Sequence, residues 1–248
     1  MSAESVLAGK AALVTGGGRG IGEAGARAFA AAGAAVAVAA RSRDQVERVA
    51  GEITAAGGRA AALVCDVSDY GSVEKAFTQA AAAFGGIDLV FANAGVNLDR
   101  ELIADTDPGL WRQTIDINLI GVYHTARAAI PHLRARGGGK IITVGSGRGR
   151  RGSTHASAYA CSKAGQWLLV RCLAEELIDD NIAVNELVPG PVWTEMNAKW
   201  GDRVDPIFKG GPEWAKTPAD VVPLLMFMAT QPDRGPTGQS FALNRREI

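Results

Sequence analysis

Short apolar runs alternate with longer amphipathic or alanine-rich segments along nearly the whole chain. Short continuous apolar runs are typical of buried strands, and the longer segments are typical of helices. We therefore predict strands at residues 10–14, 36–40, 60–64, 87–91, 140–144, 181–187 and 238–243. We predict helices at about 23–32, 44–56, 70–84, 107–131 or beyond, 154–179 and 218–230. The regular alternation predicts an α/β fold, and the chain has no repeat or linker that would divide it.

A glycine-rich turn follows the first predicted strand, with the sequence TGGGRGIG at residues 15–22. A strand, a glycine loop and a helix in this order form the context that a phosphate-binding turn requires. Small residues let the backbone approach a pyrophosphate, and the N-terminus of the following helix supplies amide groups. A plain glycine turn is the alternative, but the flanking strand and helix favour a dinucleotide site.

Arg41 stands at the end of the second predicted strand. In dinucleotide-binding folds an acid at this place binds the ribose 2′-hydroxyl, whereas an arginine accommodates a 2′-phosphate. The first acid after the strand is Asp44, and Arg19 in the glycine turn could supply a second phosphate ligand. We therefore favour NADP(H) over NAD(H). The alternative is that Arg41 and Arg43 are solvated loop charges.

Tyr159 and Lys163 lie four residues apart within a predicted helix. That spacing places both side chains on one face, one turn apart. A phenol exchanges protons poorly near neutral pH because its ordinary pKa is about 10, and a nearby ammonium lowers that pKa. Such a tyrosine could trade a proton with a substrate oxygen. Taken alone, the pair fits a half-exposed aromatic side chain beside a solvated lysine better than a catalytic pair, and the rest of the chain has to change that balance.

Composition and charge limit the classes of function. The chain has 248 residues, of which 47% are hydrophobic and 21% charged, as in ordinary globular proteins. Its formal net charge of zero gives no general attraction to nucleic acid or membrane. We expect no signal peptide or membrane span. The three cysteines form no CxxC pair and the three histidines lack zinc-ligand spacing, so we expect reduced thiols, a cytoplasmic protein and no catalytic metal.

Several motifs occur in a fixed order, and together they make the chain resemble the short-chain dehydrogenase/reductase family in its single-domain form. The motifs are TGGGRGIG at 15–22, Asp66-Val67, Asn93-Ala94-Gly95, Asn118, Ser146, Tyr159-x-x-x-Lys163, and Pro189-Gly190 with Thr194. Each is weak alone, but their order is specific, and the match runs from about residue 10 to 243. The resemblance implies one Rossmann-like domain over 1–248, with a doubly wound, seven-stranded parallel sheet flanked by helices on both faces and binding NAD(P)(H).

The resemblance also implies roles for four catalytic residues. Tyr159 would be the general acid or base, Lys163 would lower the pKa of that tyrosine and bond the nicotinamide ribose, and Ser146 would donate to the substrate carbonyl oxygen. Asn118 would hold a proton-relay water. These roles suit hydride transfer to a carbonyl carbon, since the growing alkoxide needs a hydrogen-bond donor and then a proton.

The cofactor contacts carried over by the resemblance follow the strands in order. They are Gly16, Gly18, Arg19, Gly20, Ile21, Gly22, Arg41, Ser42, Asp66, Val67, Asn93, Ala94, Gly95, Tyr159, Lys163, Pro189, Gly190, Val192 and Thr194. The chain departs from the family pattern at two places. The Ser-Ser pair common at the active serine is Gly145-Ser146, and Asn244-Arg245-Arg246 replaces the Gly-Gly common after the last strand.

Two segments should shape the substrate site. The first holds Arg148, Arg150, Arg151 and His155, which either steer an anionic or phosphopantetheine-bearing substrate or, as we favour, form a solvated or subunit-contact loop. The second, at about 191–217, is rich in large apolar side chains and predicts a lid over an apolar pocket, with ordinary packing or an oligomer contact as the alternative. The predicted substrate contacts are Ser146, His155, Trp193 and Met196.

Three functions remain open from the sequence. The leading one is an NADP(H)-dependent oxidoreductase for ketones and secondary alcohols, with reduction of 3-oxoacyl thioesters as one option. The second is a sugar or polyol dehydrogenase that uses NAD. The third, a dinucleotide-binding regulator without turnover, is disfavoured because the four catalytic residues are intact. The family is usually tetrameric, and the resemblance implies a homotetramer or homodimer that uses the helices at 107–136 and 154–179.

Overall fold

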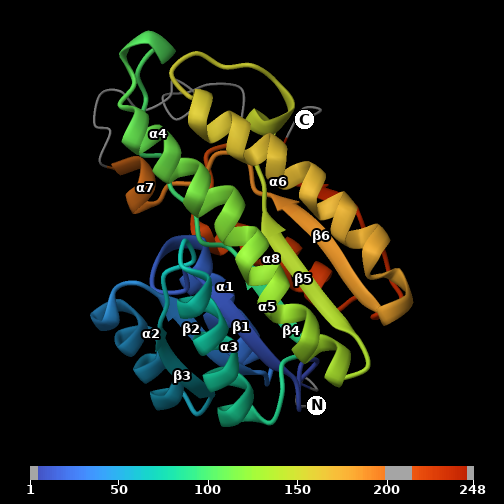
Figure 1. Cartoon of the computed structure of the whole chain (residues 1–248). Coiled ribbons are helices and arrows are strands. Elements are labelled where there is room, and N and C mark those ends of the chain that lie inside the picture. The colour runs from blue at the N-terminus through green and yellow to red at the C-terminus, as the bar shows by residue number, and fades with distance from the viewer. Residues whose placement is uncertain (1–4, 199–213, 245–248) are drawn as a thin grey trace.

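The structure is a computed structural model of the chain, and it describes residues 5–198 and 214–244. Its strands pair in parallel in one sheet with the order β3-β2-β1-β4-β5-β6-β7 (Figure 1). They are β1 (Ala11–Thr15), β2 (Ala35–Ala40), β3 (Arg59–Val64), β4 (Leu89–Ala92), β5 (Gly139–Val144), β6 (Ile182–Val188) and β7 (Ser240–Ala242). The predicted seven-stranded parallel sheet is confirmed. The strand order reverses between β1 and β4, which is where ligands bind in open α/β sheets.

Helices cover both faces of the sheet (Figure 1). They are α1 (Gly20–Ala31), α2 (Arg43–Ala55), α3 (Tyr70–Phe84), α4 (Pro108–Ile115), α5 (Gly121–Ala135), α6 (Ser157–Glu176), α7 (Glu195–Ala198) and α8 (Val222–Ala229). Successive strand residues point to opposite faces, so Leu13 packs with α3, α5 and α6, whereas Val14 packs with α1, α2 and α8. Burial on both faces explains the continuous apolar runs in the sequence.

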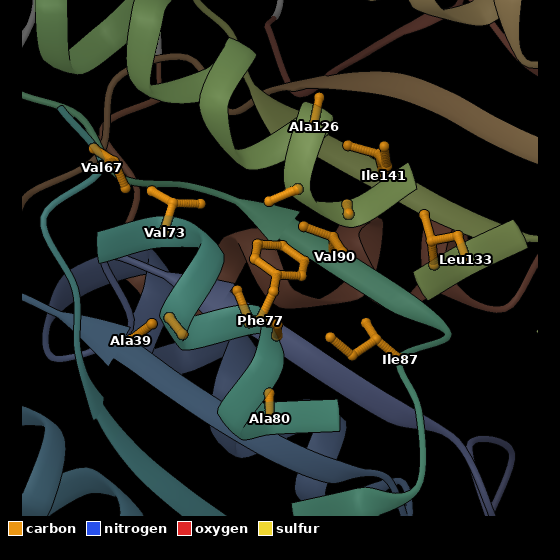
Figure 2. Packing of buried hydrophobic residues seen from close by; sticks show 14 of the residues in the cluster. Ala39, Val67, Val73, Phe77, Ala80, Ile87, Val90, Ala126, Leu133 and Ile141 are labelled. Atoms are coloured by element: carbon orange, nitrogen blue, oxygen red, sulfur yellow. The ribbon is translucent and has the colours of Figure 1, made fainter. Parts of the chain in front are cut away.

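Phe77 of α3 lies at the centre of one apolar layer (Figure 2). Its ring lies among Val73, Ala80 and Val90, and Ala126 of α5 belongs to the same cluster. All five side chains are almost fully buried. Burying a large apolar side chain of this kind stabilises a fold by roughly 1.5–3 kcal/mol. The layer fixes α3 and α5 against β4, whose carboxyl end faces the candidate site.

The long helix predicted from residue 107 is interrupted. Asp107 caps α4 as expected, with Oδ1 accepting from the Gly109 amide at 2.6 Å. A π-helical turn, η2 (Asp116–Ile120), then separates α4 from α5. The apolar spacing does not show this change, because a single wide turn alters the helical period too little. π-Helical turns frequently mark functional sites, and Asn118 lies in this one.

The segment predicted as a substrate lid is only partly described. Its start contains α7, and an isolated parallel bridge pairs Val192 with Lys216 near its end. Residues 199–213, including Trp200 and Phe208, lie outside the described residues. Within 5–198 and 214–244, no helix combines the length and apolarity needed to cross a membrane.

Candidate active site

The glycine turn lies between β1 and α1. Gly16 and Gly20 have φ values of +65° and +57°, in the left-handed region that glycine adopts without strain. A Cβ atom on Gly22 would lie 2.2 Å from the carbonyl oxygen of Gly16. Gly22 therefore allows the start of α1 to pack on the turn. It does not line the cavity described below, and its predicted cofactor contact stays a prediction.

Asn93, at the end of β4, ties that strand to the glycine turn. Its Nδ2 donates to the carbonyl oxygens of Thr15 at 3.0 Å and Gly16 at 3.1 Å. The Thr15 hydroxyl in turn accepts from the amides of Asn93 at 3.1 Å and Ala94 at 3.2 Å. These four bonds join the ends of β1 and β4, so the turn is held at the point where the strand order reverses.

Asp66 and Arg41 lie after β3 and β2, at one end of the site. Burial acts to raise the pKa of Asp66, but hydrogen bonds from Ser68 and the charge of Arg41 outweigh it, so the pKa is below its ordinary value. Asp66 Oδ1 accepts from the Ser68 amide at 2.9 Å and hydroxyl at 2.7 Å. The Arg41 guanidinium is exposed and contributes to the same cavity wall. This end offers a carboxylate and a guanidinium to a polar ligand.

A cavity of about 780 Å³ runs along the carboxyl ends of the strands. Every predicted cofactor contact lines it except Gly22, and so do the predicted catalytic residues Ser146, Tyr159 and Lys163. This volume is within the usual range for sites that bind cofactors. Lining residues that the sequence analysis did not identify are Ala40, Gln45, Cys65, Val96, Asn97, Arg100, Ile117, Val144, Gly145, Gly147, Gly152, Ser153, Pro191, Glu195, Asn197 and Asn244.

Ser146 and Tyr159 both line the wall of the cavity. Ser146 follows β5 and begins a short 3-10 helix, η3 (Gly147–Arg150), with its Oγ accepting from the Arg148 amide at 3.2 Å. Burial raises the pKa of Tyr159, and the neighbouring Ser146 hydroxyl and the charge of Arg148 offset only part of that effect. The phenol is therefore protonated at neutral pH and can act as a hydrogen-bond donor.

Lys163 is buried one turn after Tyr159. Its Nζ donates to the Val144 carbonyl oxygen at 2.7 Å and to Gln166 Oε1 at 2.9 Å, and it lies 5.8 Å from the centre of the Tyr159 ring. Burial lowers the pKa of Lys163 to about 8, and the charge of Glu186 acts in the opposite direction. Gln166 was missed, although its spacing of three residues from Lys163 could have indicated it.

The expected lowering of the Tyr159 pKa by Lys163 stays a prediction. The groups that lower that pKa are Ser146 and Arg148. Lys163 donates to Val144 and Gln166, and with a pKa of about 8 it is largely neutral at the higher pH where Tyr159 ionises. The spacing correctly places the lysine near the ring but does not determine which acceptors hold its ammonium.

Asn118 is fully buried and does not line the cavity. Its Nδ2 donates to the Val96 carbonyl oxygen at 2.8 Å and the Ser162 hydroxyl at 3.0 Å. Its Oδ1 accepts from the Val96 amide at 2.8 Å. The side chain thus joins the loop after β4 to α6. The proton-relay role stays a prediction.

The predicted substrate contacts divide into two groups. Ser146 and Met196 line the cavity, whereas His155 and Trp193 do not. His155 is exposed and adopts a φ of +55° in the loop before α6, and Trp193 is 43% exposed. Both assignments stay predictions. Proximity in sequence to Ser146 or Pro189 did not show which side of the loop faces the cavity.

The arginines of the segment after Ser146 also take two different positions. Arg148 and Arg151 line the cavity, together with Arg100 from the loop after β4. The side chain of Arg150 is only 13% exposed and pairs with Glu186. The favoured interpretation of a solvated loop is therefore wrong for Arg150.

Comparisons with known proteins agree with this geometry. The profile of the family described as short chain dehydrogenase matches residues 10–205. A 3-oxoacyl-[acyl-carrier-protein] reductase of Chlamydia pneumoniae is 31% identical over 96% of each chain. A (-)-trans-carveol dehydrogenase of Rhodococcus erythropolis is 38% identical over 62% of this chain, and the aligned part spans only 56% of that relative. The crystal structure of a putative NAD(P) dependent gluconate 5-dehydrogenase from Beutenbergia cavernae, with NADP bound at low occupancy, has a TM-score of 0.87, 34% identity and 97% coverage of each chain.

Proposed function

The chain belongs to the short-chain dehydrogenase/reductase family, and on that basis we propose that it is an NADP(H)-dependent enzyme that interconverts ketones and secondary alcohols. Members of this family bind NAD(P) and oxidise or reduce CH–OH groups and carbonyls. The observation that carries the proposal is the presence of Ser146, Tyr159 and Lys163 together on the wall of one cavity. Two hydroxyl groups there can meet one substrate oxygen.

The chemistry assigned to these residues is acid–base catalysis. A bound nicotinamide supplies or accepts the hydride at the substrate carbon. Ser146 and Tyr159 donate hydrogen bonds to the carbonyl oxygen during reduction, and Tyr159 then transfers its proton to the alkoxide. The raised pKa of Tyr159 keeps the phenol protonated for this step. In alcohol oxidation the tyrosine must first lose that proton, so high pH should favour the oxidative direction.

The preference for NADP(H) is supported by Arg41 and Arg19, which line the same cavity. A guanidinium can bind a phosphate through two parallel hydrogen bonds and stays charged at all relevant pH values. Arg41 stands where NAD-binding relatives of this fold carry an acid. The B. cavernae structure, which contains NADP, also supports the choice.

We propose 3-oxoacyl thioesters as the first substrates to test. The C. pneumoniae reductase supports this choice because it aligns along almost the whole of both chains. Sugars and polyols are the second class, supported by the similarity to the putative gluconate dehydrogenase. Arg100, Arg148 and Arg151 line the cavity, so both panels should include anionic members with matched neutral ones.

The deciding experiment is a panel of ketones and alcohols assayed with NADPH, NADP, NADH and NAD. We expect turnover of at least one ketone, faster with NADPH than with NADH at equal concentration. A protein that binds NADPH but turns over no member of the panel would instead support the regulator. A strong NADH preference would contradict the role of Arg41.

We also propose that the chain, as one domain, assembles into a homotetramer. Large apolar side chains are exposed on α4, η2, α5 and α6, the elements expected to form one interface: Leu110, Ile120, Tyr123 and Leu168. Light scattering should give four times the mass of the 25.7 kDa chain. Leu168→Glu should reduce that mass, whereas Val64→Glu, at an exposed apolar position on β3, should not.

A further inference from the structure

A buried acid interrupts the apolar sequence of β6. Glu186 is 0% exposed and lies opposite Thr143 of β5, three residues before Ser146. Its carboxylate packs against the backbone of Gly145, where an added Cβ atom would fall 1.8 Å from Oε1. Glu186 therefore lies directly under the turn that carries Ser146.

The carboxylate is held by two partners from distant parts of the chain. Arg150 of η3 forms an ion pair with it through Nη2, and Arg150 Nη1 donates to Oε1 at 3.5 Å. The Ser240 hydroxyl of β7 donates to Oε2 at 2.6 Å. Ser240 also accepts from Arg150 at 2.8 Å and Arg171 at 3.3 Å. The cluster thus joins η3, α6, β6 and β7.

The ring of Trp167 helps to hold Arg150 and Arg171 in place. The guanidinium carbons of Arg150 and Arg171 lie 4.9 Å and 4.2 Å from the Trp167 ring centre. Cation–π contacts of this kind stabilise desolvated guanidinium groups. An isolated buried charge is costly, so Arg150 and Glu186 each require the other in place. The pair therefore restrains η3, which begins immediately after Ser146.

Glu186 also acts on Lys163. Its negative charge raises the pKa of Lys163 against the lowering effect of burial. The other charged or titratable groups near this cluster are Arg148 and Arg150 from η3, with Tyr159 and Arg171 from α6. The element η2 contributes the uncharged Asn118, which bonds Ser162. Glu186 is the group whose charge favours the ammonium form of Lys163.

We propose that Glu186 is a positioning residue of the active site, which fixes the Ser146 turn through Arg150 and places its buried negative charge near Lys163. The proposal rests on the proposed function for the reaction that the site performs. The position and charge of Glu186 follow from the fold, so this part of the proposal holds whichever substrate the site takes.

The proposal is tested by NMR titration of the Lys163 side-chain nitrogen in the full-length protein, which gives the midpoint pH of its protonation. The Lys163→Met variant assigns the signal, because it lacks that nitrogen. Glu186→Gln preserves the shape of the side chain and removes its charge, so the midpoint should fall by about one pH unit or more. Arg150→Met leaves the Glu186 charge uncompensated, so the midpoint should rise. The double variant should titrate between the two single variants.

If the substitutions only loosened the packing around Lys163, the midpoints of the variants would change in a different way. Increased access of water would relieve the burial of Lys163 and raise the midpoint in both single variants. A rise in both, or no shift in Glu186→Gln, would overturn the proposal. Glu47→Gln, on the exposed surface of α2, is the matched control and should leave the midpoint unchanged.

Turnover provides a second measurement. In Glu186→Gln the pH at which kcat for ketone reduction declines on the alkaline side should move down together with the Lys163 midpoint. For a shift of one pH unit, kcat at pH 8 should fall about fivefold, because the ammonium fraction of Lys163 falls by that factor. If no substrate is turned over, the proposed function fails while the NMR titration still decides the role of Glu186.

Discussion

Asn118 binds both backbone groups of Val96 with one side chain. Nδ2 donates to the Val96 carbonyl oxygen and Oδ1 accepts from its amide, each at 2.8 Å. Only an amide side chain supplies a donor and an acceptor in this arrangement. Because Val96 lines the cavity, this contact sets the position of the loop after β4 beside the site.

Replacing Asn118 should therefore affect stability as well as activity. Asn118→Leu leaves both Val96 groups without their partners, and we expect the free energy of unfolding to fall by about 1–3 kcal/mol. Urea denaturation measures this change. Gln113→Leu, on the exposed face of α4, should be close to neutral. Equal losses in the two variants would contradict the role of the Val96 contact.

Tyr159→Phe removes the proposed proton donor while keeping the ring. We expect kcat to fall by about 10²–10⁴-fold, with NADPH affinity little changed, because the hydroxyl acts on the substrate oxygen. Steady-state kinetics and fluorescence titration with NADPH separate the two effects. Tyr123→Phe, at an exposed position on α5, is the control. Retention of full activity by Tyr159→Phe would rule out this tyrosine as the acid.

Arg41→Ala should reduce the preference for NADPH. Loss of a charged hydrogen-bond partner to the 2′-phosphate costs about 1.5–3 kcal/mol, so KM for NADPH should rise about 10- to 100-fold while KM for NADH changes little. Arg43 is exposed and pairs with Glu47, so Arg43→Ala provides a matched control. The assignment of Arg41 fails if both variants shift KM for both cofactors alike.

Gly145→Ala should be destabilising because Glu186 fills the space that its side chain would need. We expect a loss of at least about 1–3 kcal/mol, as for other overpacked cores. Adding Glu186→Ala clears the conflict, so the double variant should be more stable than the sum of the two single changes predicts. Thermal unfolding of all four proteins completes the cycle. Strict additivity would show that the two positions do not conflict.

Lys163 should make the free energy of unfolding depend measurably on pH. Its pKa is about 8 in the folded protein and 10.5 ordinarily, so the unfolded chain binds more protons between these values. Stability conferred by Lys163 therefore rises with pH across that window, by up to about 3 kcal/mol. The difference in unfolding free energy between the wild type and Lys163→Met should show this rise from pH 8 to 10.5. A constant difference would show that Lys163 titrates normally.

The sequence was sufficient to predict the sheet because its strands are buried on both faces and read as apolar runs. The one-turn spacing singled out Tyr159 and Lys163, and the resemblance to the family supplied Ser146; all three line the cavity. It did not show η2, because one wide turn barely changes the apolar period. The acid at Glu186 is visible in an apolar strand, but its partner Arg150 is 36 residues away and is found only in the fold.

The sequence also did not predict which way side chains in the loops point. In Arg148, Arg150 and Arg151 the sequence offers three similar charges without a helical or strand period to orient them. The fold separates them, since Arg150 reaches Glu186 and the other two line the cavity. His155 falls in the predicted helix at 154–179, but the structure starts α6 at Ser157 and leaves His155 in the preceding loop.

The position of Trp167 between two guanidinium groups gives the protein an internal optical signal. Indole emission shifts in wavelength when nearby charges move, and one of these charges belongs to the turn that follows Ser146. A variant that keeps Trp167 as its single tryptophan would therefore report movement of that turn through its emission spectrum. Such a reporter could follow the binding of dinucleotide or substrate in real time without any attached dye.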